Sequence, residues 1–483
     1  MQSFLVDLVG LWDPLAVALT VLLSIIASAH VVLYKRDSRA AVGWVGLIWL
    51  VPIVGAVLYA LLGINRIRRQ AVEQRGLRLL MSGEFPRAPV QKGVALPPEV
   101  HHLHTLAELV DRVASRPLTT GNAVQPLVNG DQAYPAMLAA IDGANQSIGL
   151  STYIFDSDDT GRQFQNALER AVNRGVAVRI LIDTVGARYS WPPIVRELKR
   201  RKIPVASFGR TLLPWRMPYF NLRNHRKLLI VDGKIGFTGG MNIRAGHVLE
   251  NSPKHPVQDL QFRIEGPVVA HAMQTFAEDW AFTTKEQLSG EAWFPRPADS
   301  GTVVARGIND GPDEDFERAR FVFLGALACA QKSVRIVTPY FLPDQGLISA
   351  LDVAALRGVQ VDIILPEVNN LALVHWAATA QLWQVLARGC RVFYTAPPFD
   401  HSKVMLVDGG WALFGSTNWD PRSLRLNFEF GVECYNAELV RCLDGLVGRK
   451  LEHAREVTAE EVNSRSLPVR LRDGLARLAA PYL

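Results

Sequence analysis

The N-terminal part of the chain is dominated by two long apolar stretches. Residues 14–33 are almost wholly apolar, and residues 41–63 contain no charged residue. A helix needs about 20 apolar residues to cross the core of a bilayer, so the pattern predicts two transmembrane helices, over about 14–34 and 41–63. Glycines and a proline within the second stretch also allow a kinked or re-entrant hairpin in place of a straight helix.

Two other interpretations of these stretches are a cleaved signal peptide and a buried core hairpin. The first thirteen residues carry two Asp and no basic residue, and a second apolar stretch follows, which argues against a signal peptide. A charge-free hairpin of this length would be unusual in a soluble core. Basic residues follow each stretch, and the positive-inside rule then favours cytoplasmic termini and a cytoplasmic catalytic region. They are Lys35, Arg36 and Arg39 in the loop, then Arg66, Arg68, Arg69, Arg75 and Arg78.

An Arg-rich, proline-spotted connector follows the apolar stretches. Apolar positions within residues 101–114 recur with the period of a helix. His101, His102 and His104 suggest a metal site, but no carboxylate or cysteine stands at ligand spacing beside them, so we predict no metal there.

From residue 121 onward, apolar strand patterns alternate with amphipathic helix patterns, and the series occurs twice. This arrangement predicts an α/β sandwich in each half and a pseudo-twofold relation between the halves. The first series is a strand over 147–155, a helix over 161–173 and a turn entering a second strand over 174–183; the second series covers 333–341, 347–356 and 357–365. The first half carries extra residues around 189–192 and 212–220; for 212–220, which mixes aromatic residues with Arg216, a lipid-facing loop and a buried connector are both open.

We therefore divide the chain into a membrane hairpin, a connector and two lobes. These segments are residues 1–70, 71–118, 119–295 and 296–483, the last including the C-terminal tail.

Composition adds two constraints. The net charge of +6 suits a partner with phosphates, whether lipid headgroups or nucleic acid. The four cysteines show neither metal-ligand spacing nor the density of a disulfide framework, so we expect free thiols in a reducing compartment.

One motif occurs in both halves in the same register. Each copy has His-x-Lys, four residues, Asp, six residues, and Gly-Gly/Ser-x-Asn. The copies comprise His225, Lys227, Asp232, Gly239, Gly240 and Asn242, and His401, Lys403, Asp408, Gly415, Ser416 and Asn418. A single His-x-Lys is an ordinary strand end, but two copies of six matched positions are not.

The apolar run after each Lys predicts a strand, on which His and Lys point to the same face. Lys227, Lys403, Asn242 and Asn418 can then neutralise one phosphate without a metal. One His can attack phosphorus to give a phosphohistidine, while the other protonates the leaving alkoxide and later deprotonates the acceptor. The symmetry of the motifs does not say which His attacks.

The paired motifs resemble the double signature of the phospholipase D superfamily, and nearly the whole chain resembles its bacterial cardiolipin synthases. The resemblance implies two phospholipase D-type α/β lobes preceded by two transmembrane helices. It also implies a phosphatidyltransferase of the bacterial inner membrane that makes cardiolipin and glycerol from two phosphatidylglycerol molecules. Its partners would be phosphatidylglycerol, other anionic phospholipids and the membrane, with no cofactor, no metal and no nucleic acid. The oligomeric state is not predicted.

The resemblance also assigns roles. His225 would be the nucleophile and His401 the acid/base, with Glu429 orienting His225 and Asp259 orienting His401 from the opposite lobe. The alternative is that both carboxylates merely sit on strand edges. Asp232 and Asp408 belong to the catalytic motifs, but we expect them to fix the motif turns. The turn residues Gly240 and Ser416 are expected to bind phosphate; Gly240 lacks the usual hydroxyl and would use its backbone N–H.

Three other functions are weighed. A hydrolytic phospholipase D differs only in whether water reaches the intermediate, which the motifs do not distinguish. A nuclease of the same superfamily would suit the basic charge, but the N-terminal hairpin argues against it. A non-catalytic membrane scaffold would be expected to lose a motif His or Lys, and none is lost.

Overall fold

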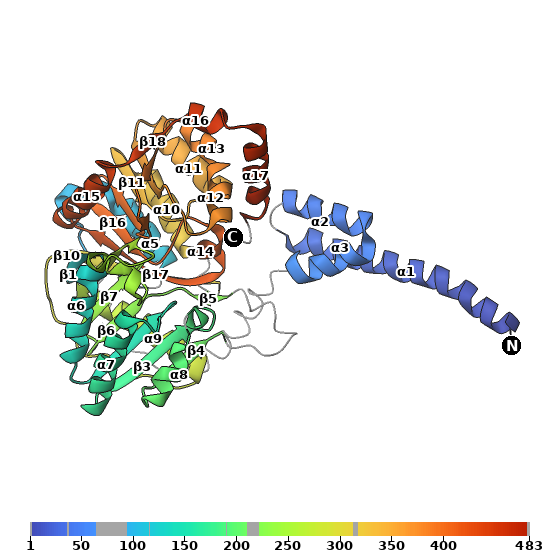
Figure 1. Ribbon diagram of the computed structural model, residues 1–483. Helices are drawn as coiled ribbons and strands as arrows, with labels where there is room; N and C mark the ends of the chain where they lie inside the picture. Colours follow the sequence, from blue (N-terminus) through green and yellow to red (C-terminus); the bar gives the residue numbers. More distant parts are fainter. Residues whose placement is uncertain are drawn as a thin grey trace. The chain divides into compact units, whose positions relative to one another are not determined.

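Residues 2–35, 38–63, 94–114, 116–189, 191–209, 222–312 and 317–480 are described by the computed structural model (Figure 1). It comprises two compact units, a helical unit at the N-terminus and a larger α/β unit. Most of the predicted Arg-rich connector and the aromatic loop over 212–220 lie outside the described residues.

Four helical segments form the described part of the N-terminal unit. They are α1 (Gln2–Tyr34), α2 (Ser38–Leu50), α3 (Pro52–Leu58) and the π-helix η1 (Tyr59–Gly63). Among the residues described, one stretch of helix is long and apolar enough to cross a membrane, Ala16–Tyr34. At 1.5 Å per residue it extends about 28 Å, close to the thickness of a bilayer core.

The second predicted transmembrane helix, over 41–63, is not continuous. It breaks at Val51, and the chain turns back so that the ring of Tyr59 lies 5.4 Å from that of Trp44, centroid to centroid. Pro52 provides no N–H to continue a helix, and Gly55 packs so closely that a Cβ there would lie 2.4 Å from the carbonyl oxygen of Leu47. The predicted second transmembrane helix is therefore not confirmed, and this segment has the kinked form that the sequence left open.

The α/β unit contains one large mixed sheet. The strands are β1 (Thr119–Val128), β2 (Ser147–Thr152), β3 (Ala177–Asp183), β4 (Val205–Phe208), β5 (Arg223–Asn224), β6 (Leu228–Val231), β7 (Ile235–Gly239), β9 (Leu260–Glu265), β10 (Val303–Asp310), β11 (Ser333–Val337), β12 (Gln360–Pro366), β13 (Arg391–Thr395), β15 (Val404–Val407), β16 (Trp411–Gly415), β17 (Asn427–Tyr435) and β18 (Arg455–Val457). Two further strands, β8 (Val257–Gln258) and β14 (Phe399–Asp400), pair with each other.

The sheet has the same order in both halves, as the internal repeat predicts. In the first half β2 lies between β3, to which it is parallel, and β6, to which it is antiparallel. In the second half β11 lies in the same way between β12 and β15. The two halves join where β1 and β10 pair antiparallel in the middle of the sheet. The fold is therefore mixed α/β.

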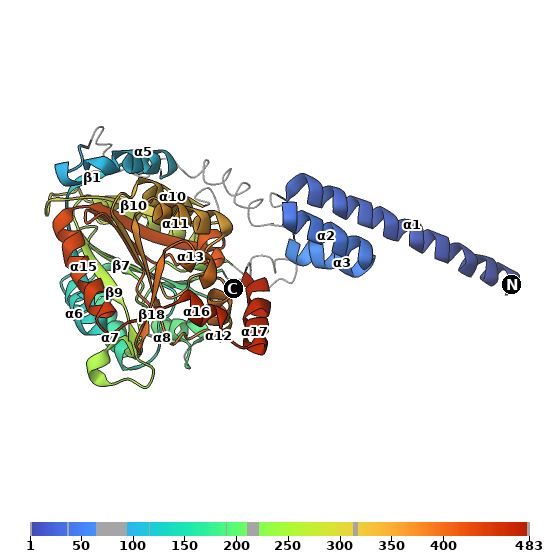
Figure 2. The same ribbon diagram turned by 90° about the horizontal axis from the view of Figure 1, so that it is seen from above.

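Helices cover both sides of this sheet (Figures 1 and 2). They are η2 (Pro98–Leu103), α5 (His104–Val113), α6 (Asn129–Asp142), α7 (Asp159–Asn173), η3 (Gly186–Arg188), α8 (Ile194–Arg200), η5 (Ala245–His247), η6 (Leu249–Asn251), α9 (Val268–Thr284), α10 (Arg318–Cys329), α11 (Gln345–Leu356), α12 (Ala372–Thr379), α13 (Leu382–Leu386), α14 (Pro421–Arg425), α15 (Ala437–Leu451), α16 (Ala459–Asn463) and α17 (Leu467–Leu478). Helices α6, α7 and α8 pack on the first half, and α5, α10, α11 and α13 on the second. A third core, to which α9 and α15 contribute, contains residues of both halves. This shared core fixes the two halves against each other.

Candidate active site

Each motif histidine follows a very short strand that pairs with the opposite half. Strand β5 pairs in parallel with β17, and the N–H of His225 donates to the carbonyl oxygen of Phe428 at 2.9 Å. In the same way β14 pairs in parallel with β8, and the N–H of His401 donates to the carbonyl oxygen of Gln258 at 2.8 Å. Because a carboxylate follows directly on each partner strand, this exchange sets each imidazole beside an acidic residue of the other half.

Each imidazole is bound through Nδ1 to a buried carboxylate. His225 Nδ1 lies 3.0 Å from both oxygens of Glu429, and His401 Nδ1 lies 3.0 Å from Asp259 Oδ2. A carboxylate only accepts, so Nδ1 carries the hydrogen and donates it. In both neutral imidazoles Nε2 is therefore the free nitrogen, available to attack phosphorus or to exchange a proton.

The motif lysines are almost wholly buried beside the histidines. Lys227 Nζ donates to the carbonyl oxygen of His225 at 2.6 Å, and Lys403 Nζ donates to that of His401. Burial lowers the pKa of Lys227 to about 7 and the pKa of Lys403 to about 8, although nearby carboxylates oppose the shift. Two desolvated ammonium groups in one site strongly favour binding of an anion.

The two histidines are neutral in the substrate-free site. Burial lowers the pKa of His225 to about 4, although Glu429 opposes the shift. Burial and the charges of Lys403 and Lys227 hold the pKa of His401 well below its usual range. A neutral imidazole is what nucleophilic attack requires.

The two carboxylates are not equivalent. Glu429 also accepts from the Ser416 hydroxyl at 2.5 Å and from Asn427 Nδ2 at 3.1 Å. Burial alone would raise the pKa of Glu429, but His225, Lys227 and the Ser416 hydroxyl hold it below its usual value. Asp259 accepts from its neighbour's backbone N–H instead, at 2.8 Å. Burial raises the pKa of Asp259 to about 6. Glu429 is thus the more firmly ionised of the two.

The motif turns are positioned by close strand packing. A Cβ on Gly239 would lie 2.6 Å from the carbonyl oxygen of Leu260, and one on Gly415 would lie 2.3 Å from that of Phe430. Only glycine fits at these two positions.

The residue after each turn glycine is hydrogen-bonded within the protein. The N–H of Ser416 donates to the carbonyl oxygen of Phe430 at 3.0 Å, and that of Gly240 points to the carbonyl oxygen of Leu260 at 3.5 Å. Because the Ser416 hydroxyl bonds Glu429, neither turn residue has its donor directed at a ligand. Gly240 and Ser416 thus lie against the carboxylates and the neighbouring strands, and their predicted role in phosphate binding stays a prediction.

The motif asparagines differ from each other. Asn242 Oδ1 accepts from the N–H of Ile154 at 3.1 Å, and its amide nitrogen, which has no partner among the described residues, can donate to a ligand. Asn418 Nδ2 donates to Ser423 Oγ at 3.1 Å, and its Oδ1 is one of the buried oxygens among the described residues with no hydrogen-bond partner. Asn242 can thus donate a hydrogen bond to a ligand, and Asn418 can accept one.

Asp232 and Asp408 lie at the far ends of strands β6 and β15 from the histidines. Asp232 accepts from the N–H groups of Asn145, Gln146 and Ser147 at 2.8–2.9 Å. Asp408 accepts from three N–H groups, at 2.7–2.9 Å, and bonds His102 Nε2 at 2.9 Å. Both carboxylates thus bond backbone N–H groups away from the motif histidines, and the role of Asp232 and Asp408 in fixing the motif turns stays a prediction.

Replacement of Asp232 by asparagine is expected to lower stability by about 2 kcal/mol, because a charged acceptor of three N–H groups is lost. Asparagine tolerates the left-handed backbone at this position (φ 51°), so the change isolates the charge. Thermal unfolding measures the effect. Asp142→Asn, which breaks an exposed ion pair with Arg170, is the control and should cost under about 0.5 kcal/mol. An unchanged melting temperature together with a large loss of kcat would contradict a structural role.

Two tyrosines of the site were not predicted. The ring of Tyr153 lies 5.3 Å from that of His225, and the ring of Tyr340 lies 6.3 Å from that of His401. They occupy matching positions after strands β2 and β11, so the internal repeat itself was the available signal. Asn427, two residues before Glu429, was also not predicted.

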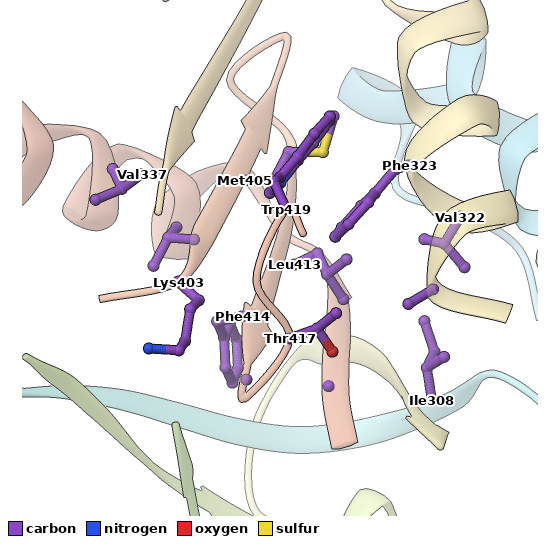
Figure 3. Close-up of a pocket in the computed structure, with 14 residues that line it drawn as sticks. Ile308, Val322, Phe323, Val337, Lys403, Met405, Leu413, Phe414, Thr417 and Trp419 are labelled. Carbon is purple, nitrogen blue, oxygen red and sulfur yellow. The ribbon is translucent and has the colours of Figure 1, made fainter. Parts of the chain in front are cut away.

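A pocket near Lys403 is not a second ligand site (Figure 3). Its volume is about 20 Å³, and apolar side chains such as Phe323, Met405 and Trp419 line it. That space holds about one water molecule. The aliphatic stem of Lys403 borders the pocket while its nitrogen points away from these side chains.

Comparison with known proteins matches the chain to two protein families and to several curated relatives. The family described as cardiolipin synthase, PLD-like domain, matches residues 137–280 and 323–447, and the phospholipase D-nuclease N-terminal family matches residues 22–63. Cardiolipin synthase A of Pseudomonas putida is 30% identical over 96% of both chains. Cardiolipin synthase of Geobacillus kaustophilus is 28% identical over 99% of this chain and 94% of that protein.

Among solved structures, phosphatidylserine synthase of Haemophilus influenzae aligns with a TM-score of 0.62 and 15% identity, over 78% of this chain and 100% of that chain. At that identity the likeness shows the fold alone. The paired motifs, the crossed histidine–carboxylate pairs and the matched families together show that the chain belongs to the bacterial cardiolipin synthases of the phospholipase D superfamily.

Proposed function

We propose that this enzyme transfers the phosphatidyl group of one phosphatidylglycerol to a glycerol hydroxyl of a second, giving cardiolipin and free glycerol. The observation that supports this most directly is the pair of crossed histidine–carboxylate contacts at 3.0 Å. In this reaction the leaving group and the attacking group are both glycerol hydroxyls. A nearly symmetric site can therefore serve both half-reactions.

In the first half-reaction, His225 Nε2 attacks phosphorus, a P–N bond forms and the P–O bond to glycerol breaks. His401 Nε2–H donates its proton to the departing oxygen. The bound phosphodiester carries a negative charge, which raises the pKa of His401 from its low value in the empty site. Binding of substrate thus supplies the protonated imidazole that the step needs.

In the second half-reaction, His401 Nε2 takes the proton of the second phosphatidylglycerol's terminal hydroxyl. The hydroxyl oxygen attacks phosphorus, the new P–O bond forms and the P–N bond to His225 breaks. Lys227 and Lys403 neutralise the oxygens that gain charge in both steps, and Asn242 can donate to one of them. Water in place of the second lipid would give phosphatidic acid, the hydrolytic alternative.

The N-terminal unit supports a location in the bacterial inner membrane. In our proposal α1 crosses the membrane, and α2 and α3 enter and leave it on one side, since neither alone reaches across about 30 Å. Lys35 and the five arginines that follow Gly63 would then share the side of the catalytic region, whereas residues 1–13 carry no basic residue. The positive-inside rule places that side in the cytoplasm. This arrangement departs from the cytoplasmic N-terminus that two crossings would give.

The test of the function is product identity. The purified full chain is supplied with phosphatidylglycerol in mixed micelles with a metal chelator, and lipids are identified by mass spectrometry. Cardiolipin and glycerol in equal amounts are expected. Phosphatidic acid and glycerol without cardiolipin would overturn the transferase in favour of the hydrolase.

The rate is expected to fall as pH rises through about 7 to 8. Both lysines must be protonated to hold the phosphate, and their pKa values in the free enzyme are about 7 and about 8. The pH profile of kcat/KM, which reports the free enzyme, is the measurement. The arginine of Lys227→Arg stays charged at all these pH values. The alkaline limb of this variant's pH profile should therefore shift to higher pH, even if its maximal rate is lower. An alkaline limb that does not move would contradict the assignment to Lys227.

A further inference from the structure

Helix α17 displays an apolar stripe on its solvent side. Leu467, Leu471, Leu475 and Leu478, called here the leucine stripe, follow one another at spacings of four, four and three, so they share one face of the helix. Their side chains are between 58% and 71% exposed. Single exposed apolar residues are normal on a protein surface, but a continuous row of large ones marks a contact surface.

The opposite face of α17 already packs against the protein. Asp473 and Ala476 are its buried residues, and Ala476 shares a small core with Val374 and Ala377 of α12. Asp473 pairs with Arg465 and Arg472. The outward direction of the leucine stripe is therefore fixed by the packing of the other face.

The charged residues of α17 suit an anionic surface. The helix carries Arg470, Arg472 and Arg477, and its single acidic residue, Asp473, is buried. Arg472 is held at the side of the helix by the ring of Trp376, at 4.4 Å. An exposed leucine row flanked by arginines is the pattern of a helix that lies in a membrane interface and attracts anionic lipid.

The stripe is linked to the active site through a shared core. Tyr340, whose ring faces His401, packs against the same small core that supports α17, and α17 runs beside α12 (Figure 1). The Tyr340 hydroxyl donates to Oδ1 of Asn370, which lies in the loop before α12, at 2.8 Å. In the other half, Trp191 is 87% exposed, close in sequence to Tyr189, whose ring lies 6.4 Å from that of Tyr153. Exposed apolar groups thus occur on α17, which shares a core with Tyr340, and two residues along the chain from Tyr189.

We propose that α17 is an interfacial helix that inserts the leucine stripe among the acyl chains of an anionic bilayer and so holds the active site at the level of the lipid headgroups. The inference rests on the proposed function, because it explains how a headgroup phosphate reaches His225 without the lipid leaving the membrane. Lipid is favoured over a second copy of the chain, since pairing two α17 helices through their stripes would bring their arginines together.

The first test locates α17 in the full chain reconstituted in phosphatidylglycerol-containing vesicles. A fluorophore is attached at Leu471→Cys after replacing Cys329 and Cys442 by serine. The control position is Leu356→Cys at the end of α11, where the native side chain is 68% exposed. Acyl-brominated phospholipid should quench the label at 471 at least about twofold more than the label at 356. Equal quenching would overturn the proposal. An unquenched label at 471 in a protein that has the mass of a dimer would also overturn the proposal, because a second copy would then cover the leucine stripe.

The second test separates docking from folding and from chemistry. The double variant Leu471→Gln/Leu475→Gln should turn over phosphatidylglycerol in vesicles about tenfold more slowly. It should turn over short-chain phosphatidylglycerol, dispersed below its critical micelle concentration, at the unsubstituted rate. Leu356→Gln should change neither rate. An equal loss on both substrates, or no loss on vesicles, would overturn the proposal. If the unsubstituted enzyme acts on neither substrate, the proposed function fails, while the quenching result still decides the role of α17.

Discussion

Replacing His225 by asparagine is expected to lower cardiolipin formation by at least about 10⁴-fold, because the nucleophile of the first half-reaction is lost. The covalent intermediate should disappear with it. When turnover is stopped at alkaline pH, without acid, a phosphatidyl-histidine should be detectable by mass spectrometry in the native enzyme. The same adduct should be absent from His225→Asn. Asparagine fits the space and keeps a polar group, so the loss should not come from unfolding.

His401→Asn is the matched control, since it removes the equivalent residue of the other half. General acid–base catalysis is worth about 10²–10⁴-fold, and it is needed least when the leaving group is already acidic. With phosphatidyl-p-nitrophenol as donor, His401→Asn should still release a burst of p-nitrophenolate and keep its adduct on His225. His225→Asn should release no burst. A burst from His225→Asn with an adduct on His401 would reverse the two roles.

The repeat allowed much of the α/β unit to be predicted from sequence. Apolar runs of strand length next to helical patterns gave β2, α7 and β3, and again β11, α11 and β12, at nearly the observed bounds. These elements are long enough for the period of their apolar residues to be read. Strands β5 and β14, which deliver the histidines, are two residues long. No periodicity exists in so short a segment, so the exchange between halves was not predictable from pattern, and the pairing of His225 with Glu429 came only from the family resemblance.

Gly240 shows what spacing alone does not reveal about a turn residue. The sequence suggested a lost hydroxyl whose backbone N–H still binds phosphate. In the structure a Cβ at Gly240 would lie 2.5 Å from Asp259 Oδ1 and 2.8 Å from the carbonyl oxygen of His401. The missing side chain therefore makes room for the shorter carboxylate, whereas Ser416 fills the matching place and bonds the longer Glu429. Such compensation between residues of distant sequence position appears only when the neighbours are known.

The break in the second apolar stretch has a related cause. Hydropathy reports how strongly residues 41–63 avoid water, but it does not report the path of the chain. Pro52 and Gly55 indicated that a bend was allowed. Whether the bend is taken depends on packing such as that between Trp44 and Tyr59, fifteen positions apart in the sequence.

The non-equivalence of the two carboxylates leads to the second large expected effect. Glu429→Gln should lower kcat by about 10²–10⁴-fold with little change in KM. A glutamine keeps the shape but removes the charge that orients Nδ1–H of His225 and stabilises the positive imidazole formed on attack. Glu429 now accepts hydrogen bonds from three donors, namely His225 Nδ1, the Ser416 hydroxyl and Asn427 Nδ2. The amide N–H of a glutamine would face one of these donors, and that hydrogen bond would be lost.

Asp259→Asn is the matched variant, and the leaving-group experiment distinguishes the two. Asp259 supports the acid/base His401, whose proton a leaving group as acidic as p-nitrophenol does not need. With phosphatidyl-p-nitrophenol, Asp259→Asn should therefore release its burst at close to the native rate, while Glu429→Gln should remain slow because attack by His225 is impaired. Equal bursts from both variants would show that the carboxylates act only as structural partners. Unequal bursts would mean that the pseudo-symmetric halves have divided nucleophilic and acid–base work through the residues behind each histidine.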